Sequence, residues 1–373
     1  MTRMTGLTGN EMFCLDLKGL IAGDLVLGNS VYSMGFMGAI GASLQGIVGG
    51  EVSQITDVIS EGRHMSQQRL LKEARVHGAS GITGVTSELR SMQGNVEFLS
   101  VASCVHAKNP ATNRGFFSTS GNGQELYCMI DAGYLPISMV LGNVAYSMGV
   151  GGGIMGTLRS LGRGEVKEFS DIFNVTRHRA LDRIVREARE VNADAVVGIE
   201  THIMPFQGVH EMLMIGTSAH HPKLKAMACG DIVTSNLTCE EMWNLASLGY
   251  VPQKLLLGTS VYSLGLIGGV AAMFKSLARG EVNELTSVLY DAREQAMGLI
   301  KAEAEAIGAD QVVGVKTYIH EIGSLVEFLA VGTAVKQHPD AKPLSPMLPA
   351  QAVIPQKSTW ISRSDGGFAQ VAH

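Results

Sequence analysis

The sequence lacks the close cysteine pairs that mark zinc ribbons and redox sites. Its cysteines are odd in number, and reduced thiols in a cytosol are the simplest account of them: Cys14, Cys104, Cys128, Cys229 and Cys239. The first ten residues also lack an apolar core of signal-peptide length, which argues against export by that route. Both absences place the chain in the cytoplasm.

A basic stretch is absent as well. The chain has 29 Lys and Arg against 34 Asp and Glu, a net charge of −5, and its basic residues are spread along the whole length. Nucleic-acid-binding domains usually concentrate their positive charge on one face or segment. Nucleic acid is therefore not expected as a partner.

What the sequence does contain is one segment that occurs three times. Leu-Gly-Asn-Ser-Val-Tyr-Ser-Met-Gly at residues 27–35 returns as Leu-Gly-Asn-Val-Ala-Tyr-Ser-Met-Gly at 141–149 and as Leu-Gly-Thr-Ser-Val-Tyr-Ser-Leu-Gly at 257–265. The match continues in register to the end of each unit, and a spacing of about 115 residues is the size of a small domain rather than of a solenoid repeat. The sequence predicts three modules and a tail: residues 5–107, 119–221, 235–337 and 338–373.

The tail is rich in proline. Half of the ten prolines of the chain lie within it: Pro339, Pro343, Pro346, Pro349 and Pro355. This composition predicts disorder after residue 337.

The second copy shows the pattern of one module most clearly. An apolar strand is predicted at 137–141, and Gly142-Asn143 is predicted to form a turn and an N-cap for a helix from near Val144 to Leu161. A second, amphipathic helix is predicted from Glu165, because apolar residues follow there at steps of three and four.

Two apolar β segments, 195–199 and 211–215, close the unit. The fold class predicted for the chain is therefore α+β, with three tandem two-layer β-α-α-β-β modules. A sheet of three strands leaves edges that must be paired or covered, and packing against other copies is the expected solution.

Three uncharged runs reach the length that a membrane span needs: residues 25–50, 133–158 and 255–274. Each run includes a predicted strand and turn, so the helix within it is shorter than a span. Small residues allow close helix approach both in a membrane and in a subunit interface. Burial in an interface is the preferred interpretation, and membrane association stays open as the alternative.

The stretch from Leu27 through the Gly-Gly-Glu-Val segment, Glu73-Ala-Arg, Gly84-Val85 and the closing strand resembles the YbjQ family, often labelled putative heavy-metal-binding domains. In the third copy, the segments starting at Ile307 and Ala330 are particularly similar to it. The resemblance implies a dodecin-like subunit fold and self-association into rings, described for the family as pentameric. With three modules per chain, either five chains stack their equivalent copies into three layers or the assembly differs.

The family label also implies a metal, but the residues do not supply a recurring ligand set. Thiolate and imidazole sites usually leave paired Cys or His a few residues apart. This chain offers His220-His221 and the single Cys14 and Cys128, whose position in the third copy is Asn244. No cofactor is predicted, and a metal site assembled between chains remains an alternative.

Three residue types recur at equivalent places and are the candidate functional residues. The arginines and glutamates could form an acid and its modulator in a cleft, but an ion pair that fixes helix to sheet or module to module is preferred. The tyrosines are expected one turn into the first helix, as packed aromatics rather than as ligand-facing phenols. The residues are Arg63, Arg177, Arg293, Glu97, Glu211, Glu327, Tyr32, Tyr146 and Tyr262.

Catalytic motifs are missing. The chain shows no Ser-His-Asp order, no nucleophile elbow, and no His or Cys at the same place in all three copies. The leading hypothesis is a non-enzymatic, self-assembling scaffold or ligand-binding oligomer. A metal-binding or metal-sequestering protein is the alternative, and an enzyme with one degenerate site comes third.

Overall fold

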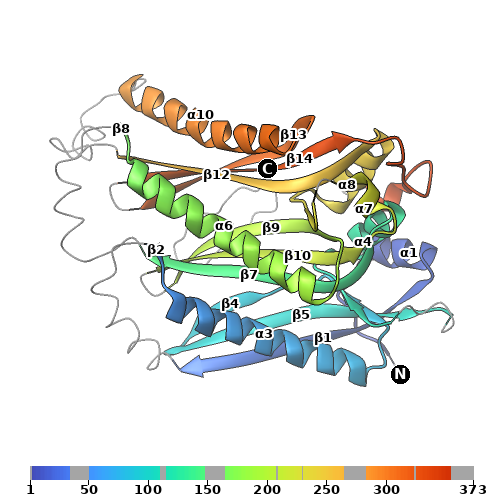
Figure 1. Cartoon of the computed structure of the whole chain (residues 1–373). Helices are drawn as coiled ribbons and strands as arrows, with labels where there is room; N and C mark the ends of the chain where they lie inside the picture. The colour runs from blue at the N-terminus through green and yellow to red at the C-terminus, as the bar shows by residue number, and fades with distance from the viewer. Residues whose placement is uncertain are drawn as a thin grey trace.

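The computed structural model describes residues 2–33, 50–109, 115–147, 164–206, 209–228, 230–263, 283–322 and 325–353. Within these ranges the chain forms three α+β modules that lie side by side (Figure 1), as the sequence predicts. Each module has a short leading helix, a long strand, a helix of 24 residues that packs on the sheet, and further antiparallel strands.

The described elements follow the same order in each module, with one exception. The first module contains α1 (Gly9–Leu17), β1 (Leu20–Ser33), β2 (Gly50–Glu51), α3 (Ser53–Val76), β3 (Gly81–Thr83), β4 (Glu88–Met92) and β5 (Asn95–Ala107), and β6 (Phe117–Ser118) follows it. The second contains α4 (Gly123–Asp131), β7 (Leu135–Ser147), β8 (Gly164–Glu165), α6 (Lys167–Glu190), β9 (Ala195–Phe206) and β10 (Val209–His220), followed by α7 (Leu224–Met227) and β11 (Val233–Thr234). The third contains α8 (Cys239–Ser247), β12 (Tyr250–Ser263), α10 (Asn283–Ala306), β13 (Gln311–Ile322) and β14 (Leu325–Gln337). The exception is that two short strands of the first module, β3 and β4, take the place of the single strands β9 and β13 of the others.

Short strands carry each sheet across a module boundary. The sheet orders are β1-β5-β3-β6 with β4 beside β5, then β11-β9-β10-β7-β2, and β13-β14-β12-β8. Thus β2 of the first module pairs with β7 of the second, and β8 of the second pairs with β12 of the third. Strand β1 has no such partner among the described residues and is an edge of its sheet.

The predicted turn and helix start at Gly142-Asn143 are wrong. Strand β7 runs straight through both residues to Ser147, and β1 and β12 do the same at their equivalent positions. The glycine is needed for packing, since a Cβ at Gly142 would lie 2.2 Å from the backbone oxygen of Ala180 in α6. The remainder of the predicted first helix, residues 148–163, lies outside the described residues.

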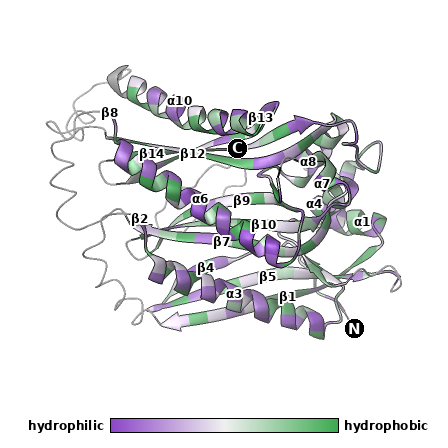
Figure 2. Ribbon diagram, in the orientation of Figure 1, coloured by the Kyte–Doolittle hydropathy of each residue, from purple (hydrophilic) through white to green (hydrophobic). Residues whose placement is uncertain are grey.

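The long helices are amphipathic, as expected from their spacing of apolar residues. In Figure 2, α3, α6 and α10 carry hydrophobic and hydrophilic positions in alternating bands. The buried residues of α6 include Phe173, Leu181 and Ile184. No helix in the described ranges is long and apolar enough to cross a membrane.

The predicted disorder of the tail is wrong for residues 338–353. Ala341 and Ala352 are buried in the core, and the tail ends its described part in a 3-10 turn, η3 (Ala350–Ala352). A high proline content suggests disorder, but the apolar residues between the prolines pack on the leading helices and order this part of the tail. The rest of the tail, 354–373, lies outside the described residues.

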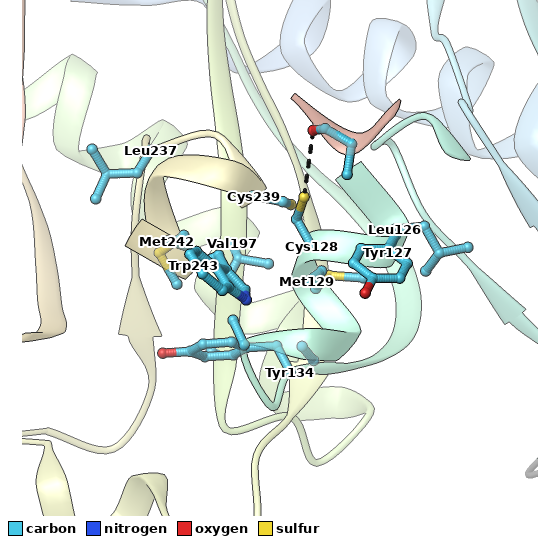
Figure 3. Packing of buried hydrophobic residues seen from close by; sticks show 14 of the residues in the cluster. Leu126, Tyr127, Cys128, Met129, Tyr134, Val197, Leu237, Cys239, Met242 and Trp243 are labelled. Carbon is cyan, nitrogen blue, oxygen red and sulfur yellow. Dashed lines mark hydrogen bonds between the residues drawn. The ribbon is translucent and has the colours of Figure 1, made fainter. Parts of the chain in front are cut away.

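The leading helices α1, α4 and α8 lie together at one end of the molecule (Figure 1) and share one apolar core, part of which Figure 3 shows from close by. Leu126 of α4 and Trp243 of α8 lie in it together with Leu15 of α1 and the tail. The buried carboxylate of Asp131 joins all of these parts, accepting hydrogen bonds from Lys18 (2.5 Å), Trp243 Nε1 (2.8 Å) and Ser345 Oγ (2.8 Å). Burial raises the pKa of Asp131, but these donors outweigh it and hold the pKa below its usual value.

Candidate functional site

The recurring arginines and glutamates lie at the boundaries between modules. Arg63 on α3 of the first module donates from Nε and Nη2 to the carboxylate of Glu211 on β10 of the second, at 2.9 and 2.7 Å. Both side chains are fully buried. The Nη1 group of Arg63 donates to the carbonyl and the hydroxyl of Ser87, so all three nitrogens of the guanidinium donate hydrogen bonds.

The second boundary repeats this arrangement. Arg177 on α6 donates from Nε (2.9 Å) to Oε1 of Glu327 on β14 and from Nη2 to Oε1 (2.8 Å) and Oε2 (2.5 Å), and again both side chains are fully buried. Arg177 Nη2 also donates to the hydroxyl of Tyr146, and the guanidinium lies 4.2 Å from the centre of that ring. Burial raises the pKa of Tyr146 to about 12, so the phenol stays neutral beside the pair.

The two remaining members of the set do not meet each other within one chain. Arg293 is exposed on α10, where its guanidinium lies 5.8 Å from the ring of Phe328. Glu97 on β5 is half-buried and accepts a hydrogen bond from the amide of Asn29 at 3.1 Å. Neither forms an ion pair with a described residue. The first module therefore carries a glutamate, and the last module an arginine, without the ionic partner found at the two internal boundaries.

The tyrosines lie on strands rather than on the predicted first helix. In all three modules the recurring tyrosine follows directly after the residue that pairs with the glutamate across the strands. These pairs are Val31 with Glu97, Ala145 with Glu211, and Val261 with Glu327. Tyr32 packs edge-to-face on Phe98, with ring centres 5.7 Å apart, and Tyr262 is buried. Among the three, Tyr146 contacts the arginine.

Backbone hydrogen bonds add to each boundary. The N–H of Val52 donates to Ala145 O (2.8 Å), and the N–H of Ala145 donates to the hydroxyl of Thr56 (2.9 Å). The second boundary has the equivalent bonds. The N–H of Val166 donates to Val261 O (2.8 Å), and the N–H of Val261 donates to the hydroxyl of Ser170 (2.9 Å). The recurrence of a hydroxyl at 56, 170 and 286 was the signal in the sequence for this contact.

A His–Glu pair also spans each boundary and was missed from the sequence. His64 Nε2 lies 2.6 Å from Glu187, and His178 Nε2 lies 3.9 Å from Glu303. The interaction with the facing glutamate raises the pKa of both imidazoles, against the opposing effect of burial. The third module carries Glu294 at the equivalent place.

These pairs predict a pH-dependent stability. A raised folded-state pKa contributes stability that is fully present below the unfolded value of about 6.5 and is lost as the pH rises through the folded pKa. The double variant His64→Gln/His178→Gln should therefore lose less stability than the wild type when the pH rises from 6 to 9. Urea unfolding at a series of pH values measures this, and parallel curves for the two proteins would contradict it.

The strand that receives the preceding module is apolar. Leu141 and Leu257, at equivalent positions of β7 and β12, are 1% and 2% exposed, whereas Leu27 on β1 is 53% exposed. The same holds four residues further along the same face, where Ala145 and Val261 are fully buried and Val31 is 53% exposed. The surface that is buried on the second and third modules is thus exposed on the first module.

The residues considered for metal do not converge. His220 pairs with Asp194 at 2.6 Å, and His221 packs on the ring of Tyr134. Burial raises the pKa of the Cys14 and Cys128 thiols, which disfavours the thiolate form that a metal needs. Within the described ranges, no group of three or more His, Cys, Asp or Glu side chains could hold a metal ion.

Fold and boundaries together define a tandem array of α+β modules, each joined to the next by a buried ion pair between helix and sheet. The sequence profile of the YbjQ family, described as "Putative heavy-metal-binding", matches residues 20–105, 135–221 and 251–338. These matches cover most of the chain, which therefore belongs to the YbjQ family as three tandem copies.

Relatives of two kinds are similar to the chain. The encapsulin nanocompartment protein Rv1762c of Mycobacterium tuberculosis is 27% identical over 242 residues, which cover 62% of this chain and 89% of the relative. UPF0145 proteins match a single module: that of Pseudothermotoga lettingae is 45% identical over 83 residues, covering 22% of this chain and 78% of its own length. Ta0182 of Thermoplasma acidophilum is 40% identical over 94 residues, covering 23% and 79%.

Proposed function

We propose that this protein is a non-enzymatic building block that assembles with copies of itself. The observation that carries the proposal is the use of the recurring residues. At two boundaries the arginine and glutamate form a fully buried, bidentate ion pair between modules, and both side chains are closed off from solvent and from any substrate. Such pairs specify geometry between packed surfaces rather than chemistry.

The relatives support an assembly role. One of them is named as an encapsulin nanocompartment protein, and the single-module relatives correspond in length to one unit of this chain. The proposal places the assembly in the cytoplasm, where the free thiols of Cys14, Cys104, Cys128 and Cys239 would persist.

Native mass spectrometry of the purified chain tests the proposal. We expect a discrete species of several chains at micromolar concentration, with no additional mass. A monomer would contradict the proposal. A fixed metal count per chain that survives dialysis would favour the alternative, a heavy-metal-binding protein, for which the description of the family is the support.

A further inference from the structure

An open apolar groove lies on the third module between α10 and β13. Its volume is about 400 Å³, and its apolar lining is Met297, Ile300, Ala304, Ala309, Val312 and Val315. A groove of this kind on the last module is a candidate docking surface. The equivalent grooves of the other two modules show which side chains would occupy it.

The equivalent grooves on the other two modules are filled by the module that follows. Ile184 and Val196, which correspond to Ile300 and Val312, share one core cluster with Leu255 and Leu257 of the third module. One module earlier, Leu70 and Ile82 share a cluster with Met139 and Leu141 of the second module. In both cases two side chains of the next module's long strand enter the groove.

The side chains that would fill the third groove are exposed on β1. Leu25 and Leu27 stand at the positions of Leu255 and Leu257, and they are 41% and 53% exposed, whereas the corresponding side chains of β7 and β12 are at most 2% exposed. The groove and the exposed pair lie on the last and first modules, so one chain carries both halves of a third junction.

The charges at the two ends are complementary in the same register. Arg293 on α10 corresponds to Arg63 and Arg177, and Glu97 corresponds to their partners. Within one chain Asn29 donates to Glu97, whereas the equivalent Asn143 donates to the carbonyl of Thr56 on the preceding module. A module docked in front of the first one would thus accept the hydrogen bond of the Asn29 amide. The Glu97 carboxylate would then be available to pair with an arginine.

We propose that the third module of one chain docks on the first module of a second copy, head to tail, with Leu25 and Leu27 in the groove and Arg293 paired with Glu97. This inference rests on the proposed function and identifies its surface. The junction is heterologous, so successive copies close into a ring if the rotation per module permits and otherwise extend as a filament.

The junction between chains differs from those within the chain at one position. Where His64 and His178 face Glu187 and Glu303, the copy-to-copy junction places Glu294 opposite Glu73. Two carboxylates repel, whereas an imidazolium and a carboxylate attract. The junction between chains is accordingly the weakest of the three, and chains separate there before modules do.

Charge reversal tests the docking directly. Glu97→Arg and Arg293→Glu should each raise the dissociation constant of the assembly at least tenfold in sedimentation velocity, and the double variant should recover it, because the reversed pair can form again. Circular dichroism should stay unchanged, since both residues lie outside the core of a single chain. Arg189→Glu, at an exposed ion pair with Asp231 on the second module, is the matched control and should assemble normally.

Two further variants probe the groove and the register. Leu27→Asp should abolish assembly, whereas Val175→Asp, at a 55% exposed position on the outer face of α6, should not. Glu294→His should lower the dissociation constant severalfold below pH 6.5, because it restores the pair found at the internal junctions.

The outcomes separate the two proposals. If the wild type assembles but the reversals at 97 and 293 leave it intact, or the double variant fails to recover, the docking surface is wrong while self-assembly stands. If Glu294→His leaves assembly unchanged, the register is wrong. A monomeric wild type overturns the proposed function and this inference with it.

Discussion

Replacing Glu327 by leucine should lower the free energy of unfolding by about 3–5 kcal/mol, because Arg177 would be left as a buried charge without a partner. Both side chains of this ion pair have 0% exposure, so bulk water solvates neither charge. Urea denaturation followed by circular dichroism measures the loss.

The double variant Arg177→Met/Glu327→Leu should recover most of that loss, since apolar side chains of similar volume often replace a buried ion pair without cost. Glu88→Leu, which removes the partner of Arg90 in an exposed pair, is the control and should change stability by less than about 1 kcal/mol. Equal effects of Glu327→Leu and Glu88→Leu would contradict the role given to the buried pair.

The second large effect is expected from Gly142→Ala. The added Cβ would meet the backbone oxygen of Ala180 at 2.2 Å and the backbone nitrogen of Ile184 at 2.7 Å, so helix α6 would have to move away from β7. Overpacking against backbone atoms that cannot rotate aside should cost about 3 kcal/mol.

Gly298→Ala provides the opposite case in the same background. Gly298 lies inside α10, and a Cβ added there would meet no atom within 4 Å, so alanine should raise stability by about 0.5–1 kcal/mol through helix propensity. Thermal unfolding of both variants measures the two shifts. A tolerated Gly142→Ala would show that the strand and the helix are not held at the close distance described.

The Leu-Gly-Asn segment shows where the sequence was misleading. Glycine followed by asparagine is a strong turn and cap signal, and both residues were interpreted in that sense. In β7 the glycine instead allows the close approach of a helix backbone, and Asn143 bonds across the boundary to Thr56. Both roles depend on an element distant in sequence, which local patterns do not reveal.

The recurring residues were found because the module is repeated, but their pairing was not predictable in the same way. Repetition identifies which residues matter and gives no information on which copy each contacts. Arg63 reaches Glu211, 148 positions along the chain, rather than Glu97 of its own module. The amphipathic helix and the two closing strands, whose signals are local, were predicted in their correct places.

A cryo-electron microscopy structure of the assembled protein tests the central claim most directly, that the contact between modules continues from one chain to the next. We predict α10 of one copy packed on β1 of another, with the Arg293 guanidinium within hydrogen-bonding distance of the Glu97 carboxylate and Leu27 buried. An assembly in which β1 faces solvent, or pairs with β1 of a second copy, would contradict the claim.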